Sequence, residues 1–206
     1  MEQPLYWVYR THILTWRNQY VQAKLVSPPA RSLRDIYGKY GYRSGLQDEP
    51  YGVDLDLTFQ VDPHHPHPDN YFQSASFTLF SDRLVQLMST FGVKAEVFPV
   101  KLVDKRGQSL SDLKYFVFHS LEGVLNAMDE EKSGWNGDYD VGIPQLVLDY
   151  ENFEHRPLFK CNHIYVPLMR NDVKEAILAQ GMTGFAFLAP ERYRSGSFGP
   201  TPEFDE

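Results

Sequence analysis

Cysteine is nearly missing from this sequence, whose 206 residues contain only Cys161. An intrachain disulfide is therefore excluded, and a lone cysteine favours a reducing compartment. Cys161 lies within residues 159–166, a run whose composition is typical of a strand. We expect a packed structural thiol there rather than a nucleophile.

Long apolar runs and a basic leader are also missing. No stretch approaches the roughly 18 apolar residues that a membrane-spanning helix needs. The first ten residues lack the basic-then-apolar pattern of a secretory signal. We therefore expect a cytoplasmic protein with no membrane partner.

Basic residues are fewer than acidic ones. The chain has 20 Lys and Arg against 27 Asp and Glu, a net charge of −7, which disfavours nucleic acid as a partner. Residues 1–47 hold seven basic and two acidic residues, so this segment carries +5 and the remainder −12. That balance fits a soluble protein that meets a basic partner.

Motifs that carry catalysis are missing as well. The sequence has no G-x-S-x-G turn for a nucleophilic serine, no glycine-rich phosphate loop and no H-E-x-x-H zinc motif. We therefore expect no catalytic residues and no cofactor, and we interpret the chain as a binding protein rather than an enzyme.

Patterns of both helix and strand are present. Residues 54–62 alternate apolar and polar side chains, which predicts a half-buried strand. Residues 81–92 carry an apolar stripe at helical spacing between a serine cap and Gly92, and residues 171–181 do the same between Asn171 or Asp172 and Gly181. The prediction is an α+β fold, with a mostly antiparallel sheet and two or three short amphipathic helices packed on it.

The whole chain, 1–206, reads as a single domain. We divide it into a strand-rich and loop-rich portion, 1–78, a core, 79–190, and a loose polar tail, 191–206. Residues 27–50 predict irregular structure. Helical spacing is found over residues 121–128, and residues 145–150 predict a short strand.

The two predicted helices align without gaps at a shift of 89 residues. Four positions match: Leu84 with Val173, Leu87 with Ala176, Met88 with Ile177, and Gly92 with Gly181. An internal repeat and two independent, ordinarily capped helices both explain this alignment.

A loop rich in proline and histidine covers residues 62–69. Its imidazoles are weak candidates for zinc ligands, with Asp62 or Asp69 adding oxygen. Because a catalytic zinc site draws on ligands held rigidly by helices or strands, we expect no metal site here. The candidates are His64, His65 and His67.

Residues 129–140 combine five acids and one base with two aromatic side chains. An exposed loop of this kind suits a basic partner surface, because aromatic anchors ringed by charge are typical of binding hot spots. A solvated loop without a partner and a catalytic carboxylate pair are the alternatives. The candidate partner-binding residues are Asp129, Glu130, Glu131, Trp135, Asp138, Tyr139 and Asp140.

An ordered series of segments carries a family resemblance. The run 84–100 joins a capped helix to a strand, and further segments follow at 115–119, 125–133, 146–149, 158–160 and 173–187. Over about residues 79–190 the chain resembles a bacterial immunity protein family of the myxobacterial polymorphic-toxin type. The resemblance implies a small cytoplasmic protein, encoded beside a secreted toxin, that binds and neutralises that toxin. It implies no catalytic residues, and no toxin contacts are transferred, because these surfaces differ with each toxin.

Three functions follow from these observations. The first is an immunity protein of a contact-dependent or type VI toxin system, whose partner is a cognate toxin or effector with a basic surface. The second is a metal-dependent hydrolase built on the histidine loop. The third is an adaptor domain of a secretion apparatus, and the oligomeric state is open under all three.

Overall fold

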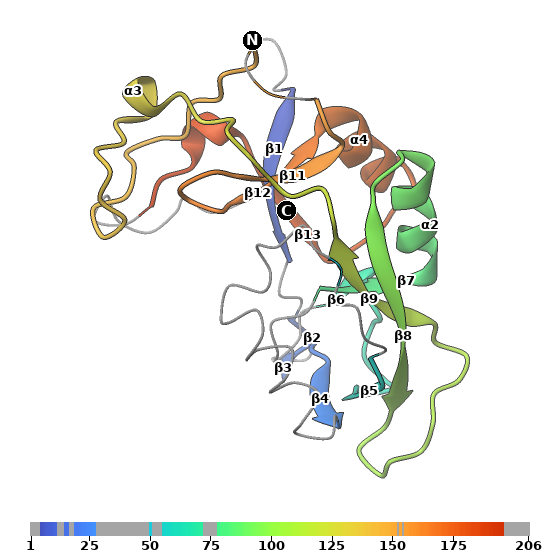
Figure 1. Cartoon of the computed structure of the whole chain (residues 1–206). Coiled ribbons are helices and arrows are strands. Elements are labelled where there is room, and N and C mark those ends of the chain that lie inside the picture. The colour runs from blue at the N-terminus through green and yellow to red at the C-terminus, as the bar shows by residue number, and fades with distance from the viewer. Residues whose placement is uncertain are drawn as a thin grey trace.

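The computed structural model describes residues 5–11, 15–16, 19–27, 50, 55–71, 78–151, 153 and 155–195. These residues confirm the α+β class, with mostly antiparallel pairing and three short helices, and divide the strands between two main sheets (Figure 1). No helix among them is long and apolar enough to cross a membrane. The irregular structure predicted for 27–50 lies almost wholly outside the described residues.

One main sheet has five strands, in the order β10-β11-β12-β1-β13. All neighbours are antiparallel except β10 and β11. The strands are β10 (Val124–Leu125), β11 (Leu158–Cys161), β12 (Pro167–Arg170), β1 (Tyr6–Thr11) and β13 (Phe185–Leu188). The N-terminal strand β1 thus lies between two strands from the C-terminal part of the chain.

The other main sheet has six strands, in the order β4-β5-β8-β9-β7-β6. They are β4 (Lys24–Ser27), β5 (Leu57–Gln60), β8 (Ala95–Val103), β9 (Tyr115–Ser120), β7 (Leu79–Ser81) and β6 (Asn70–Tyr71). Leu55, Leu57, Phe59 and Val61 are all buried in its core, which confirms the alternation predicted for β5. A separate pair, β2 (Thr15–Trp16) and β3 (Gln19–Tyr20), forms a small antiparallel ladder.

The described residues also form three α-helices and one 3₁₀ turn. They are α2 (Asp82–Thr90), α3 (Glu130–Ser133), α4 (Asn171–Ala179) and η2 (Pro190–Arg192). Ser81 caps α2 as predicted, since its side chain accepts a hydrogen bond from the Leu84 amide. The cap predicted for α4 is wrong: Arg170 is the N-cap residue and makes no side-chain cap bond. The carbonyl of the Asn171 side chain instead accepts from the Trp7 indole at 2.8 Å.

Residues 121–128, whose apolar side chains have helical spacing, do not form a helix. Val124 and Leu125 form β10, which pairs in parallel with β11, and Met128 bridges to Leu148. The strand predicted at 145–150 is reduced to that single bridge. A short apolar run fits a helix or a strand equally well, and here the partner strand β11 decides between them.

The two units that align at a shift of 89 residues have the same architecture. In the first, β7 and β8 flank β9, with α2 connecting them; in the second, β12 and β13 flank β1, with α4 connecting them. Leu79 pairs with Val117 of the central strand, and Leu168 pairs with Val8. Each unit is a split β-α-β unit built around an antiparallel strand.

Equivalent hydrogen bonds are also found in the two split units. The Asp82 amide donates to the carbonyl of Lys114 at 3.1 Å, and the Asn171 amide donates to that of Leu5 at 2.9 Å. A buried tyrosine follows each acceptor, and its hydroxyl donates to a distant carbonyl, from Tyr115 to Pro68 in one unit and from Tyr6 to Arg156 in the other. The hydrogen bonds therefore favour the internal repeat over two unrelated helices.

One hydrophobic core joins the two units. Phe80, Leu84 and Met88 of the first unit lie in the same cluster as Val173 and Ile177 of the second. Helices α2 and α4 lie next to each other over this cluster, while α3 lies far from both (Figure 1). In the described part of the chain, this cluster connects the two main sheets, each of which also has a cluster of its own.

Candidate functional site

The acidic segment 129–140 begins with the single turn α3. Asp129 caps this turn by accepting from the Lys132 amide at 3.0 Å, and its carboxylate also pairs with the Lys132 ammonium at 2.6 Å. The turn ends at Gly134, which has a φ of 69°. A Cβ there would lie 3.0 Å from the Pro144 side chain, so glycine suits both the left-handed backbone and the limited space.

The buried Ser133 anchors the segment to the molecule. Its hydroxyl donates to the Val147 carbonyl at 3.2 Å and accepts from the Val147 amide at 2.9 Å. The Asp129 amide donates to the same carbonyl at 2.9 Å. These bonds hold the first part of the acidic segment against residues 146–148.

The second half of the segment is built from side-chain turns. The Asn136 side chain accepts from the Asp138 amide at 3.0 Å, and the Asp138 carboxylate accepts from the Asp140 amide at 2.9 Å. Asp138 and Asp140 are both exposed. Such turns hold the backbone in place while leaving carboxylate oxygens at the surface.

The two aromatic side chains of the segment lie together. The rings of Trp135 and Tyr139 are 5.1 Å apart, edge to face, and the Trp135 ring stacks on His163 at 5.1 Å. The His163 Nε2 lies 2.8 Å from the Glu130 carboxylate. Trp135 is partly buried against the core, whereas Tyr139 is 63% exposed.

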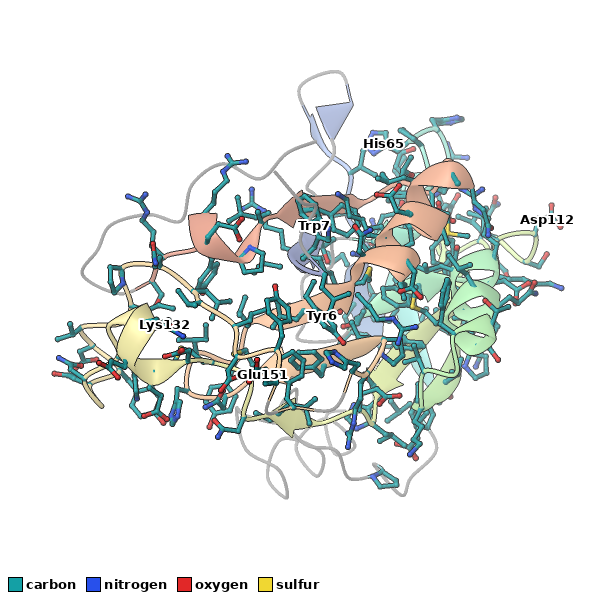
Figure 2. The ribbon with its side chains drawn as sticks, turned by 90° about the horizontal axis from the view of Figure 1, so that it is seen from above. Tyr6, Trp7, His65, Asp112, Lys132 and Glu151 are labelled. Atoms are coloured by element: carbon teal, nitrogen blue, oxygen red, sulfur yellow. The ribbon has the colours of Figure 1, made fainter. Side chains whose placement is uncertain are left out.

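The candidate carboxylates differ in their roles. The hydrogen bond from the Lys132 side chain, with that from its amide, holds the pKa of Asp129 below its usual range, and the same contact raises the pKa of Lys132. Asp129 therefore serves mainly as a cap, while Glu130, Glu131, Asp138 and Asp140 are exposed. Lys132 of this segment and Asp112 of the β8–β9 loop lie at opposite ends of the molecule (Figure 2).

Comparison with known proteins identifies the family. A family model described as "Immunity protein family (Imm11)" matches residues 6–191, nearly the whole chain. The chain belongs to this immunity protein family. It is a protein that neutralises a cognate toxin and is not an enzyme. No curated protein matches the chain.

The family match extends further toward the N-terminus than the resemblance over 79–190. It begins at Tyr6, the first residue of β1. Because β1 pairs with both β12 and β13, the second split unit of the immunity protein is incomplete without it. The resemblance over 79–190 did not include this strand, which lies more than 150 residues before its partner strands β12 and β13.

The three histidines of the loop have different neighbours in the structure. His64 lies beside an open groove of about 360 Å³, His65 is 3.9 Å from Asp62, and the ring nitrogen of His67 is 3.2 Å from the Tyr71 hydroxyl. No group of three or more His, Cys, Asp or Glu side chains among the described residues is placed to hold a metal ion. The structure therefore gives no support to the metal-dependent hydrolase.

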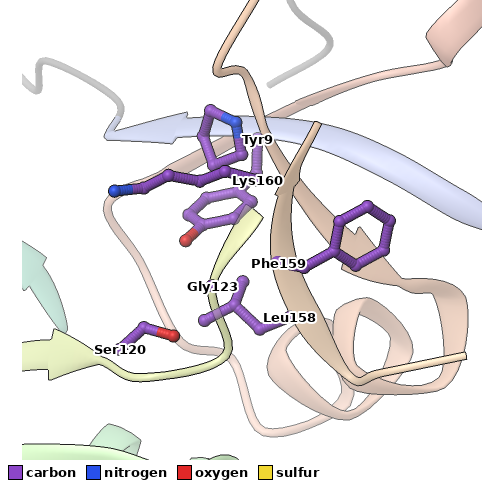
Figure 3. A pocket seen from close by; sticks show the side chains of 7 residues that line it. Tyr9, Ser120, Gly123, Leu158, Phe159 and Lys160 are labelled. Atoms are coloured by element: carbon purple, nitrogen blue, oxygen red, sulfur yellow. The ribbon is translucent and has the colours of Figure 1, made fainter. Parts of the chain in front are cut away.

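A small cavity lies where β1 and β11 meet the loop after β9 (Figure 3). Its volume is about 30 Å³, the space of one water molecule, which is too small for a substrate. The residues around it are Tyr9, Ser120, Gly123, Leu158, Phe159, Lys160 and Pro167.

Sequence reasoning missed a buried carboxylate that links the two split units. Asp69, only 2% exposed, accepts two hydrogen bonds from the Arg83 guanidinium at 2.5 Å, one from the Ser81 hydroxyl at 2.6 Å and one from the Thr183 amide at 3.0 Å. Burial alone raises the pKa of Asp69, but these bonds outweigh it and hold the pKa below its usual range. No local signal reveals this role, because the Thr183 amide is 114 residues away.

Proposed function

We propose that the immunity protein neutralises its toxin by binding a basic face of that toxin through the exposed part of residues 129–140. The observation that carries the proposal is the exposed aromatic ring of Tyr139 beside exposed carboxylates, on a segment anchored through Ser133. A preformed acidic and aromatic surface needs little ordering when it binds, which favours affinity.

Charge supports a basic partner. The chain carries −12 after residue 47, and Lys132, the one base of the acidic segment, is paired with Asp129. Carboxylates around a binding surface speed the encounter with a positive partner and suppress wrong partners. A basic toxin cleft or groove is the complementary surface.

We also propose that the toxin is delivered by a type VI or contact-dependent system and is met in the cytoplasm. The family match supports a toxin partner, and a buried cysteine without a disulfide is compatible with a reducing compartment. Fractionation of the producing cells tests the location: recovery of the protein with the periplasm or the medium would contradict it.

Neutralising three exposed carboxylates tests the binding surface. We expect Glu131→Gln, Asp138→Asn and Asp140→Asn together to slow association with the cognate toxin about tenfold at low salt and to weaken its salt dependence. Asparagine retains the acceptor oxygen that Asp138 offers to the Asp140 amide, so the turn is preserved. The toxin is the neighbouring gene product whose toxicity the wild-type protein suppresses, and surface plasmon resonance gives both rate constants.

The matched control is Asp112→Asn, which removes an exposed carboxylate at the opposite end of the molecule. Its association rate should be that of the wild type. An unchanged rate and salt dependence in the triple variant would exclude residues 129–140 as the steering surface.

A further inference from the structure

We propose that the loop of the β11–β12 hairpin, Asn162–Tyr165, is a second part of the toxin-binding surface and that it contacts arginine side chains of the toxin. This proposal rests on the function proposed above. The loop follows the acidic segment by more than 20 residues in the sequence, and the fold brings the two into contact.

The hairpin loop and the acidic segment are joined by side chains. His163 bonds to Glu130 at 2.8 Å and stacks on Trp135 with an interplanar angle of 26°. Trp135 in turn contacts Tyr139. The hairpin loop therefore continues the aromatic cluster of the acidic segment.

Asn162 fixes the position of the loop. Its side-chain carbonyl accepts from the amides of Ala127 and Met128 at 3.1 and 3.2 Å, and its side-chain amide donates to Asn126 at 2.6 Å. The Cys161 amide closes the hairpin on the Val166 carbonyl at 2.9 Å. The loop is therefore held in one position before any partner arrives.

The loop holds two bulky residues in the left-handed region of backbone conformation. His163 has a φ of 60° and Tyr165 a φ of 52°, and they are the only non-glycine residues with positive φ in the described part of the chain. This conformation is unfavourable for a residue with a Cβ, and glycine or asparagine adopts it more easily.

Tyr165 is an exposed aromatic side chain of this loop. Its side chain is 36% exposed, and Cys161 and Val166 on either side of the loop are buried in the core without it. An exposed aromatic residue in a strained backbone position suggests a role in binding rather than in the stability of the fold. Tyr165 belongs to the same four-residue loop as His163, which bonds to Glu130 and stacks on Trp135.

The chemistry of this surface selects a guanidinium group. Tyr139 lies in the sequence between the exposed Asp138 and Asp140, so this surface offers both a ring face for stacking and oxygens for paired hydrogen bonds. A planar guanidinium uses both, whereas a lysine ammonium is more strongly hydrated and offers no plane to stack. We therefore expect toxin arginines at this contact.

The sharpest test is Tyr165→Gly. Glycine accepts the φ of 52° without strain, so the side chain is removed while the backbone geometry is kept. We expect a cooperatively folded protein, checked by thermal unfolding, and a rise of about tenfold in the Kd for the cognate toxin, mainly through faster dissociation. Tyr165→Asn, which also tolerates this φ, should do the same.

Leu178→Ala is the matched control, because Leu178 is an exposed apolar side chain, 51% accessible, on α4. Its Kd should be that of the wild type. Wild-type affinity in both Tyr165 variants, with weakened binding in the carboxylate triple variant, would overturn this inference and leave the proposed function standing. Wild-type affinity in all of them would overturn both.

Chemical modification of the toxin tests the contact with arginine separately. The toxin is treated with phenylglyoxal, which modifies guanidinium groups, alone and in complex, and the modified arginines are located by mass spectrometry. We expect arginines protected by the wild-type protein to become reactive in the complex with Tyr165→Gly. The same protection in both complexes, or no protected arginine, would exclude the guanidinium contact.

Discussion

At the scale of single residues, the contacts of Asp69 are the clearest case of chemistry set by the fold. Its carboxylate is buried, yet it lies between a helix cap, an arginine and a backbone amide from the other split unit. A buried charge is tolerated only when such partners surround it. The residue therefore holds the two units together rather than serving the toxin-binding surface.

Replacing Asp69 with Asn should lower the free energy of unfolding by about 2–3 kcal/mol at pH 7, because Arg83 and Ser81 lose their charged acceptor. The pKa of Asp69 is depressed in the folded protein, so its contribution is full above the unfolded value of about 4 and is lost as the pH falls through the folded pKa. Urea denaturation of both proteins from pH 7 to pH 3 measures this. A difference that stays constant with pH would contradict the role of the ionised carboxylate.

At the scale of elements, the two split units meet at the turn after α4. The Asn70 amide at the start of β6 donates to the Thr183 carbonyl at 3.1 Å, which brings the backbone of one unit against the other. Gly184 permits this approach: it has a φ of 91°, and a Cβ there would lie 2.1 Å from the Asn70 carbonyl oxygen.

We expect Gly184→Ala to destabilise the protein by at least about 2 kcal/mol, since the added methyl group meets backbone that must move. Gly181→Ala is the matched control, because Gly181 also has a positive φ, 59°, but a Cβ there meets no atom within 4 Å. That change should cost only about 1–2 kcal/mol, for the backbone strain alone. Thermal unfolding compares the two, and equal losses would show that the close approach to Asn70 has no importance.

At the scale of the whole molecule, both sheets depend on the core shared by α2 and α4. Cys161 reports on the unfolding of the five-stranded sheet, because it is fully buried there and burial raises the pKa of its thiol to about 12. We expect the thiol to become reactive at the same urea concentration at which circular dichroism reports loss of secondary structure. Labelling of Cys161 at clearly lower urea would show that the two sheets unfold separately and that the chain is not one domain.

Much of the local structure was predictable because it depends on neighbouring residues. The alternation around Leu57 and the serine cap of α2 depend on local backbone chemistry, and both are confirmed. The cap of α4 was wrong because the Asn171 side chain bonds to Trp7 across 164 residues. The helical interpretation of residues 121–128 was wrong for the same reason, since the distant strand β11 pairs with Val124 and Leu125.

The sequence by itself determined the class of fold, the acidic segment 129–140 and the toxin-neutralising family, because composition, periodicity and ordered segments are properties of the chain alone. Only the tertiary structure placed His163 on Trp135, joined the loop Asn162–Tyr165 to the acidic segment through His163 and Glu130, and surrounded Asp69 with its partners. The physical reason is distance along the chain: Trp135 and His163 are 28 positions apart, and Asp69 and Thr183 are 114 positions apart. No local propensity encodes such contacts, which form only when the two split units pack around one core.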